Sequence, residues 1–304
     1  MRKLAALLMM LLLALSCAGA EEAPAQLPID FTPGHVASPD NFSDTGYEDA
    51  SLTVVMQRVW VDNAHFNVAR VKVAHPSQLR TTLANPANLN KTNRISTIAI
   101  DNHAVVAIGG DFFTKDSYGY VVRMTEVFRK KPLQSRDMLI TDENGDFHII
   151  KNSDAAQLKA LMEAHTVVNA FNFGPGLVID GVKQDIDKDY KYNPSGFEPR
   201  CAIGQVGPLE YVLVVVDGGK GREVTISNAD GSTKKSSGCN MDILAQFMLD
   251  QGCQQAYNLD GGNSSLMVFG KENFSQKSQK AERGVSDIIY FATSIDFGLD
   301  NAEE

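Results

Sequence analysis

The chain has 304 residues, which is enough for one large domain with a sizeable hydrophobic core. Its 28 lysines and arginines against 37 aspartates and glutamates give a net charge of −9 at pH 7, which excludes a broad polyanion-binding surface. Nucleic acid is therefore not an expected partner, although an arginine and backbone amides can still bind a single phosphate group.

The N-terminus has the pattern of a secretory signal. Basic residues precede an apolar run over 4–15, and the small residues at 18–20 offer a cleavage site, so we predict a signal peptide over 1–20. The apolar run is shorter than the ~20 residues of a bilayer-spanning helix, so no membrane span is expected. Lipid attachment at Cys17 is the alternative route of processing. Both routes predict a secreted or periplasmic protein, which would be a membrane-anchored lipoprotein if Cys17 is lipidated.

The first part of the mature chain changes from an irregular segment to β-rich runs. Residues 21–50 are rich in Pro, Asp, Ala and Gly without periodicity, which predicts an N-terminal arm or linker. The main domain is expected over 51–297, with an acidic tail over 298–304. Four runs with alternating or continuous apolar residues predict strands near the start of this domain, at 51–61, 65–73, 95–100 and 104–108.

The rest of the domain adds a hairpin, two helices and a strongly apolar strand. The Asn-Gly pair at 144–145 is typical of a hairpin turn. Apolar residues at helical spacing predict helices over 155–165 and 241–251, the second with Asn240 as its N-cap. The run at 211–219 predicts a buried strand. Strands without regular helix alternation predict an α+β fold, a single domain with a mixed, mostly antiparallel sheet and a few packed helices.

Three cysteines lie outside the predicted signal: Cys201, Cys239 and Cys253. A helix between Cys239 and Cys253 would hold them ~20 Å apart, far beyond the ~7 Å limit for bridged α-carbons. We therefore expect no bridge between these two, and a bridge between Cys201 and Cys253 is the one pairing left open. No group of cysteines and histidines has the sequence spacing typical of a zinc site.

Four polar or glycine-rich patches follow or precede apolar runs, and strand ends that share a sheet edge often form binding sites. Taken singly, each Asp-Gly pair could be an ordinary turn, an arginine beside a proline could form a surface ion pair, and the paired phenylalanines could be core. Together they supply carboxylates, an arginine, amides and an aromatic face. The patches are GGDFF at 109–113, PRCAIG at 199–204, VVVDGG at 214–219 and NLDGGNSS at 258–265.

These motifs and others occur in an order that resembles the phosphodiester glycosidase family over roughly residues 52–292. The sequence departs from the family pattern where Gly109 replaces the usual Asn and where Cys201 replaces the usual Thr. The first departure removes an amide expected to bind substrate. The motifs that carry the resemblance are AIGGDFF, FGPGLVIDG, EPRCAIG, VVVDGG, ILAQFMLDQG, NLDGGNSS and ERGVSD.

The resemblance implies an exported hydrolase that cleaves the glycosidic bond of a sugar-1-phosphate diester, in exopolysaccharide or cell-envelope glycan metabolism. It implies Asp260 as the leading carboxylate, Asp217 as its partner, and Arg200 as a bidentate phosphate ligand. No cofactor is required by the sequence, although a divalent cation is compatible with it. The implied substrate-binding residues are Gly110, Asp111, Phe112, Gly261, Gly262, Asn263 and Ser264.

Two hypotheses of other classes stay open. A non-catalytic glycan-binding or envelope-assembly protein could keep the same fold, with Gly109 as a mark of lost activity. A metal-dependent phosphodiesterase could use Asp217 and Asp260 to hold a divalent cation and would cut a phosphorus–oxygen bond instead. Turnover and sensitivity to a chelator distinguish these hypotheses from a glycosidase.

Overall fold

The protein was analysed as a computed structural model that describes residues 33–113, 119–228 and 230–299. These residues belong to one compact unit, Phe31–Glu304. The predicted signal peptide over 1–20, the lipidation candidate Cys17 and most of the predicted acidic tail lie outside the described residues.

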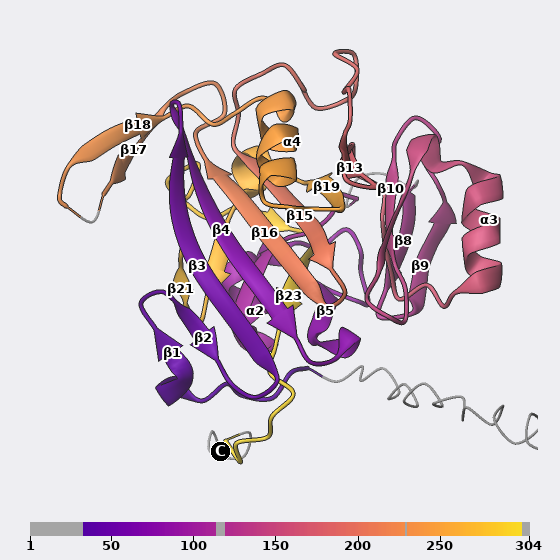
Figure 1. The fold of residues 1–304 in the computed structure, drawn as a ribbon, viewed down its shortest axis with the longest axis horizontal. Helices are drawn as coiled ribbons and strands as arrows, with labels where there is room; N and C mark the ends of the chain where they lie inside the picture. Colours follow the sequence, from indigo (N-terminus) through magenta and orange to yellow (C-terminus); the bar gives the residue numbers. More distant parts are fainter. Residues whose placement is uncertain (1–32, 114–118, 229, 300–304) are drawn as a thin grey trace, which may run out of the picture. The chain divides into compact units, whose positions relative to one another are not determined.

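The largest element is a nine-stranded sheet built around the hairpin of β3 and β4, which Figure 1 shows as two long strands. Burial alternates along the first half of β3, as expected of a strand with one face toward the core. In sheet order its strands are β1 (Phe42–Ser43), β2 (Gly46–Glu48), β3 (Leu52–Val61), β4 (Ala64–Val73), β16 (Glu210–Asp217), β15 (Arg200–Gly207), β19 (Gln255–Leu259), β13 (Gly176–Ile179) and β14 (Val182–Lys183).

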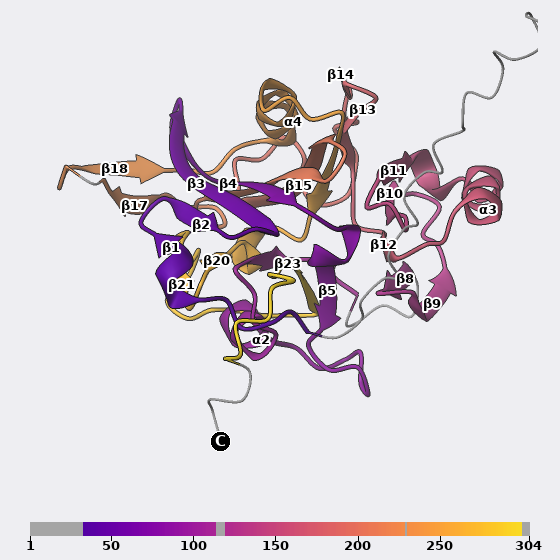
Figure 2. The same cartoon turned by 60° about the horizontal axis from the view of Figure 1, so that its bottom comes forward.

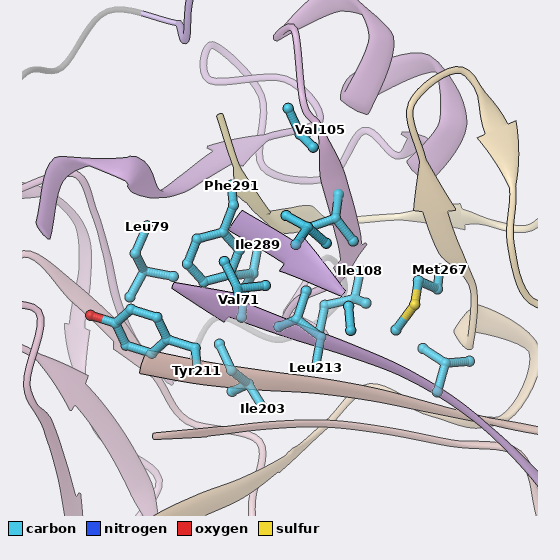
Figure 3. Packing of buried hydrophobic residues seen from close by; sticks show 14 of the residues in the cluster. Val71, Leu79, Val105, Ile108, Ile203, Tyr211, Leu213, Met267, Ile289 and Phe291 are labelled. Carbon is cyan, nitrogen blue, oxygen red and sulfur yellow. The ribbon is translucent and has the colours of Figure 1, made fainter. Parts of the chain in front are cut away.

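A five-stranded sheet packs face to face against this sheet through the main hydrophobic core. Figure 3 shows Leu213 and Tyr211 from one sheet together with Ile108, Ile289 and Phe291 from the other, and all five side chains are buried. In order, the strands of the second sheet are β21 (Glu272–Asn273), β20 (Met267–Phe269), β7 (Val106–Gly109), β23 (Asp287–Phe291) and β5 (Leu79–Leu83).

Helices cover the outer faces of both sheets, with α4 (Met241–Asp250) on the first and α2 (Ile95–Asp101) on the second, as Figure 2 shows. The position of strand β16 between two hydrophobic clusters explains why its sequence is almost wholly apolar. Its residues alternate between the inter-sheet core and the cluster under α4, so both of its faces are buried.

A third sheet carries α3 (Ala155–Ala164) on one face, where Leu158 packs among buried residues of the strands. Two two-stranded sheets are also present: the hairpin of β17 (Val224–Ser227) with β18 (Thr233–Ser236), and the long-range pair of β22 (Gly284–Val285) with β6 (Asn93–Arg94). The strands of the third sheet are, in order, β11 (Phe147–Ile150), β10 (Met138–Thr141), β12 (Asn169–Phe171), β8 (Gly119–Arg123) and β9 (Glu126–Lys131).

The predicted fold class is confirmed, because the described sheets are built from antiparallel strand pairs and carry three α-helices. Both predicted helices form, as α3 and α4. Asn240 caps α4 by accepting a hydrogen bond from the amide of Ile243. The hairpin at 144–145 joins β10 to β11, with Gly145 in the left-handed conformation at φ +79°.

Two predictions from local sequence are corrected. The run at 95–100 is helix α2 rather than a strand, because Ile95, Ile98 and Ala99 form one buried face against the second sheet. The β-branched residues suggested a strand, but the spacing of these apolar positions fits a helix. Part of the expected arm is also ordered, since β1 and β2 extend the nine-stranded sheet before residue 51.

Among the residues that the structure describes, no helix is long and apolar enough to cross a membrane. Cys201, Cys239 and Cys253 are all unpaired and buried. The expectation of no bridge between Cys239 and Cys253 is therefore confirmed, and the Cys201–Cys253 pairing does not form in this structure.

Candidate active site

The glycine-rich run after β19 forms one wall of a cleft of about 450 Å³. Because β19 and β15 are antiparallel neighbours, with Cys201 opposite Leu259, the end of one strand lies beside the start of the other. This register brings Asp260 and Arg200 to the same cleft. The predicted site residues that line it are Phe112, Arg200, Asp260, Gly261, Gly262 and Asn263.

Asp260 is the cleft carboxyl group with the most perturbed acidity. Its backbone N–H donates to the carbonyl of Gly110 at 3.0 Å, which ties the loop to the end of β7. Burial raises the pKa of Asp260 to about 6, although a hydrogen bond from Ser264 and the charge of Arg283 act in the opposite direction. The residue is partly exposed to the cleft while lying deep among protein atoms. A carboxyl group with these properties can exchange a proton near neutral pH.

Two further aspartates lie behind Asp260 and act on it electrostatically. The Asp111 carboxylate accepts hydrogen bonds from the amides of Phe112 and Asn172, at 2.7 and 2.8 Å. Asp287 is fully buried, forms an ion pair with Arg123 at 2.5 Å, and accepts the Asp111 amide at 2.7 Å. Burial raises the pKa of Asp287 to about 6 as well. The neighbouring negative charges favour the protonated forms of Asp260 and Asp287.

Glycines at the site are required by close backbone approaches. A Cβ on Gly110 would lie 2.6 Å from an oxygen of Asp287, and a Cβ on Gly261 would lie 2.9 Å from the Pro199 carbonyl oxygen. Gly262 has φ +59°, and its amide donates to that same Pro199 carbonyl at 2.8 Å. The Gly262 amide is thus already hydrogen-bonded within the protein. A Cβ at this position would meet no atom within 4 Å.

Arg200 lines the cleft but directs its guanidinium group mainly into the protein. It donates to four carbonyl oxygens and is 4% exposed. A guanidinium group has five N–H donors, so one remains for a ligand. Bidentate phosphate binding needs two parallel N–H donors, and Arg200 does not have two free. The accepting carbonyls belong to Cys239, Tyr192, Asn193 and Gly196, at 3.0, 3.3, 2.8 and 2.7 Å.

The cleft contains two further cations that the sequence reasoning did not single out, Arg283 and Lys220. Arg283 donates to the Ser264 hydroxyl at 3.1 Å and stacks over the Phe112 ring at 5.4 Å. Lys220 is exposed at the rim. Both residues could have been found from the sequence motifs, because Arg283 is part of ERGVSD and Lys220 follows VVVDGG directly.

Aromatic rings and an amide oxygen also line the cleft. Phe173 and Tyr192 stack in parallel, with ring centroids 4.4 Å apart and 2° between the planes. The Asn258 side chain donates to the Gly174 carbonyl at 2.8 Å, and its buried Oδ1 has no hydrogen-bond partner among the described residues. An aromatic face and a free acceptor are groups that a sugar ring and a hydroxyl can use.

Asp217 does not line this cleft. Its carboxylate binds His65 Nδ1 at 2.7 Å and accepts the Gln276 amide at 2.9 Å, in a separate cavity of about 510 Å³ that Trp60 also lines. The predicted pairing of Asp217 with Asp260 is therefore not formed within one cleft, and neither is a shared metal site between them. The sheet explains the separation, because β16 places Asp217 opposite His65 on β4.

The family profile of the phosphodiester glycosidases matches residues 102–292, which includes the cleft from Phe112 to Arg283. This chain belongs to the phosphodiester glycosidase family. The profile spans the third sheet, the second sheet apart from β5, and the glycine-rich loop. It also covers β13, β14, β15, β16 and β19 of the first sheet, and it leaves the β3–β4 hairpin outside.

Solved structures share the fold of this chain at low sequence identity. The catalytic domain of zebrafish N-acetylglucosamine-1-phosphodiester alpha-N-acetylglucosaminidase, auto-inhibited by its pro-peptide, matches with TM-score 0.60 and 16% identity over 86% of this chain and 87% of that one. A hypothetical protein from Synechocystis matches with TM-score 0.55 and 17% identity over 79% of this chain and 62% of that one.

One curated protein is related in sequence, the SPbeta prophage-derived uncharacterized protein YomE of Bacillus subtilis. It is 29% identical over 121 residues, which is 40% of this chain. The chain spans 17% of the length of that relative.

The departures from the family pattern lie behind the cleft. A Cβ on Gly109 would meet Ile95 at 3.3 Å and the Ser264 carbonyl oxygen at 3.4 Å, and it would face Val285. Gly109 is buried, and an asparagine at this position would point toward these groups. Cys201 is also buried, and its thiol donates to the Gly109 carbonyl at 3.6 Å.

Proposed function

We propose that this chain hydrolyses the glycosidic bond of a sugar-1-phosphate diester. The observation that carries the proposal is a carboxyl group of raised pKa, Asp260, in a cleft that also contains the cations Arg283 and Lys220. The carboxylate suits a developing positive charge on the sugar, and the cations suit the negative charge of a departing phosphodiester. Membership of the family supports this reaction type.

In the proposed reaction the bond between the anomeric carbon and the phosphate oxygen breaks, and its electron pair leaves with the phosphodiester. A water oxygen bonds to the anomeric carbon, and Asp260 accepts a proton from that water. A phosphodiester is a weakly basic leaving group, so the acid role can be small. Asp111 and Asp287 act through Asp260, because their negative charges make it a better proton acceptor near neutral pH.

The phosphate group is assigned mainly to Arg283 and Lys220. Arg200 contributes its remaining N–H and holds the 192–196 segment that forms the cleft wall. Arg283 already bonds the Ser264 hydroxyl, so a phosphate bound there would lie next to the glycine-rich loop. This places the leaving group on the cation side of the cleft.

The sugar is assigned to the polar and aromatic lining. Asn263 and Asn258 offer amide groups for hydroxyls, and the Phe173–Tyr192 stack and Phe112 offer faces for the ring. We place the reaction outside the cytoplasm, in exopolysaccharide or cell-envelope glycan metabolism, because the sequence predicts a signal peptide.

The test is a panel of sugar-1-phosphate diesters with different sugars, incubated with wild type, Asp260→Asn and the exposed-site control Asp189→Asn. Free sugar should appear with wild type and the control, and Asp260→Asn should reduce turnover by at least about 100-fold. Saccharide binding without turnover on any diester would instead support a non-catalytic glycan-binding protein. Turnover that chelator abolishes and that Asp260→Asn leaves intact would also contradict the proposal.

A further inference from the structure

Three side chains that can bind a metal meet at the turn between β10 and β11. Asp142 follows β10, His148 lies on β11, and His165 comes directly after helix α3. The Asp142 Oδ2 atom lies 2.9 Å from His148 Nε2 and 3.2 Å from His165 Nδ1. All three candidate ligand atoms are within 4.8 Å of one another. None of these residues lines the active-site cleft.

A second carboxylate lies beside one of the histidines. Glu143 Oε1 lies 3.5 Å from His165 Nδ1, and the other carboxylate oxygen accepts the Thr166 amide at 2.7 Å. That hydrogen bond fixes the Glu143 carboxylate beside the histidine. The atoms within 4.8 Å of one another are nevertheless two imidazole nitrogens and the Asp142 carboxylate oxygen, and Glu143 borders the set at His165.

The Asp142 carboxylate is held in position from behind. Its Oδ1 atom accepts the amides of Asn144 and Asp146, at 2.8 and 3.0 Å, which leaves Oδ2 directed at the two histidines. Hydrogen-bonded carboxylates of this kind orient metal ligands in proteins.

The geometry of the cluster is close to that of a tetrahedral ion site. Ligands at bond lengths of about 2.0–2.2 Å around zinc lie about 3.3–3.6 Å apart, and the measured separations from Asp142 are 2.9 and 3.2 Å. His165 Nδ1 is buried and makes no hydrogen bond of good geometry among the described residues. The side chain of Asp142 is 1% exposed, whereas those of His148 and His165 are 31% and 33% exposed, which leaves a path from solvent.

We propose that Asp142, His148 and His165 bind one Zn²⁺ ion, with water in the fourth coordination position. Imidazole nitrogen and carboxylate oxygen are typical zinc donors, and a site with three protein ligands leaves one coordination position for water. The ion would link the β10–β11 turn to the end of α3, and so fix the helix on the third sheet. Residues 17 positions apart on two different elements supply the imidazoles, which is why no zinc-like spacing is visible in the sequence.

The experiment is a titration of the chelator-treated, dialysed full chain with Zn²⁺, followed by calorimetry and by thermal melting. We expect one ion per chain and a Tm rise of about 5–10 °C at a hundredfold excess over Kd. Substitution of Co²⁺ should give the visible absorption of a tetrahedral site, and this measurement needs no variant.

His148→Ala and His165→Ala should each weaken Zn²⁺ binding by at least about 100-fold, because loss of a supporting partner alone costs about 10–100-fold. Glu163→Ala is the matched control, since Glu163 is 68% exposed near the end of α3 and is not a proposed ligand. Wild-type affinity in the control and weak binding in both histidine variants support the site. Absence of saturable binding and of tetrahedral Co²⁺ absorption in the wild type would overturn it, as would equal affinity in the histidine variants.

Discussion

Replacing Asp260 by asparagine should stabilise the protein at neutral pH while it removes activity. The native state holds the Asp260 carboxyl group at a pKa of about 6 against an ordinary value of 3.8. The native fold therefore opposes ionisation. The cost develops as pH rises from 3.8 through about 6, is complete above that value, and is absent well below 3.8. A difference of about two pKa units corresponds to about 3 kcal/mol.

Asparagine keeps the shape and removes the charge, so it also loses the attraction of Arg283 and part of the Ser264 hydrogen bond. We expect a net gain of about 1–2 kcal/mol at about pH 7.5, which is a Tm rise of about 2–6 °C for a domain of this size. At about pH 4 the native wild type is already protonated, so most of the difference should disappear.

The assay is thermal melting of wild type, Asp260→Asn and Asp189→Asn across this pH range, combined with turnover of a sugar-1-phosphate diester. Turnover of the wild type should fall as pH drops through about 6, because the reaction needs the ionised carboxylate. A variant that is less stable than wild type by the same amount at every pH would refute the reasoning, since Asp260 would then be an ordinary turn residue.

The remaining predictions concern the cations, a glycine and the thiols. Arg283→Lys should lower turnover of phosphate substrates by about 10–100-fold with little change in Tm. Arg200→Lys should instead cost about 2–3 kcal/mol of stability, since lysine cannot donate to four carbonyls. Melting and kinetics that show the reverse pattern would contradict both roles. Gly110→Ala should lower the free energy of unfolding, measured with denaturant, by about 1–3 kcal/mol, because the added Cβ would lie 2.6 Å from a carboxylate oxygen. Gly207→Ala is the control: no atom lies within 4 Å of its added Cβ, so its stability should be close to that of the wild type. Burial raises the pKa of all three cysteine thiols, so the native protein should resist alkylation. Its Tm should be the same with and without reductant. Rapid labelling would contradict this prediction, because it would show that the thiols are accessible.

Much of the site could be predicted from the sequence because its residues lie in short contiguous motifs. The loop at 258–265 combines glycines, a carboxylate and amides, and its position after β19 follows from the helix that precedes it. Arg200 was found for the same reason, beside a strand start. Its engagement with backbone carbonyls could not be predicted, because Cys239 is 39 residues away and the other accepting carbonyls belong to the irregular 192–196 segment, whose conformation no sequence pattern specifies.

Other features depend on tertiary structure that no local pattern contains. Asp217 resembled a partner for Asp260, yet the register of β16 with β4 pairs it with His65 in a different cavity. Residues 95–100 had the composition of a strand, and burial against the second sheet made them helix α2. The Asp142 cluster was invisible because its histidines belong to separate elements. The Asp217 and Asp142 arrangements depend on contacts between segments far apart in the chain, whereas for residues 95–100 the apolar spacing was a better guide than the β-branched composition.

The central claim is that the broken bond joins the anomeric carbon to oxygen, and isotope labelling tests it most directly. Hydrolysis of a sugar-1-phosphate diester in heavy-oxygen water, with mass analysis of both products, shows which atom water attacks. The account predicts that the label enters the free sugar and that the phosphate product carries none. Label in the phosphate product would mean cleavage of the phosphorus–oxygen bond and would contradict the glycosidase assignment.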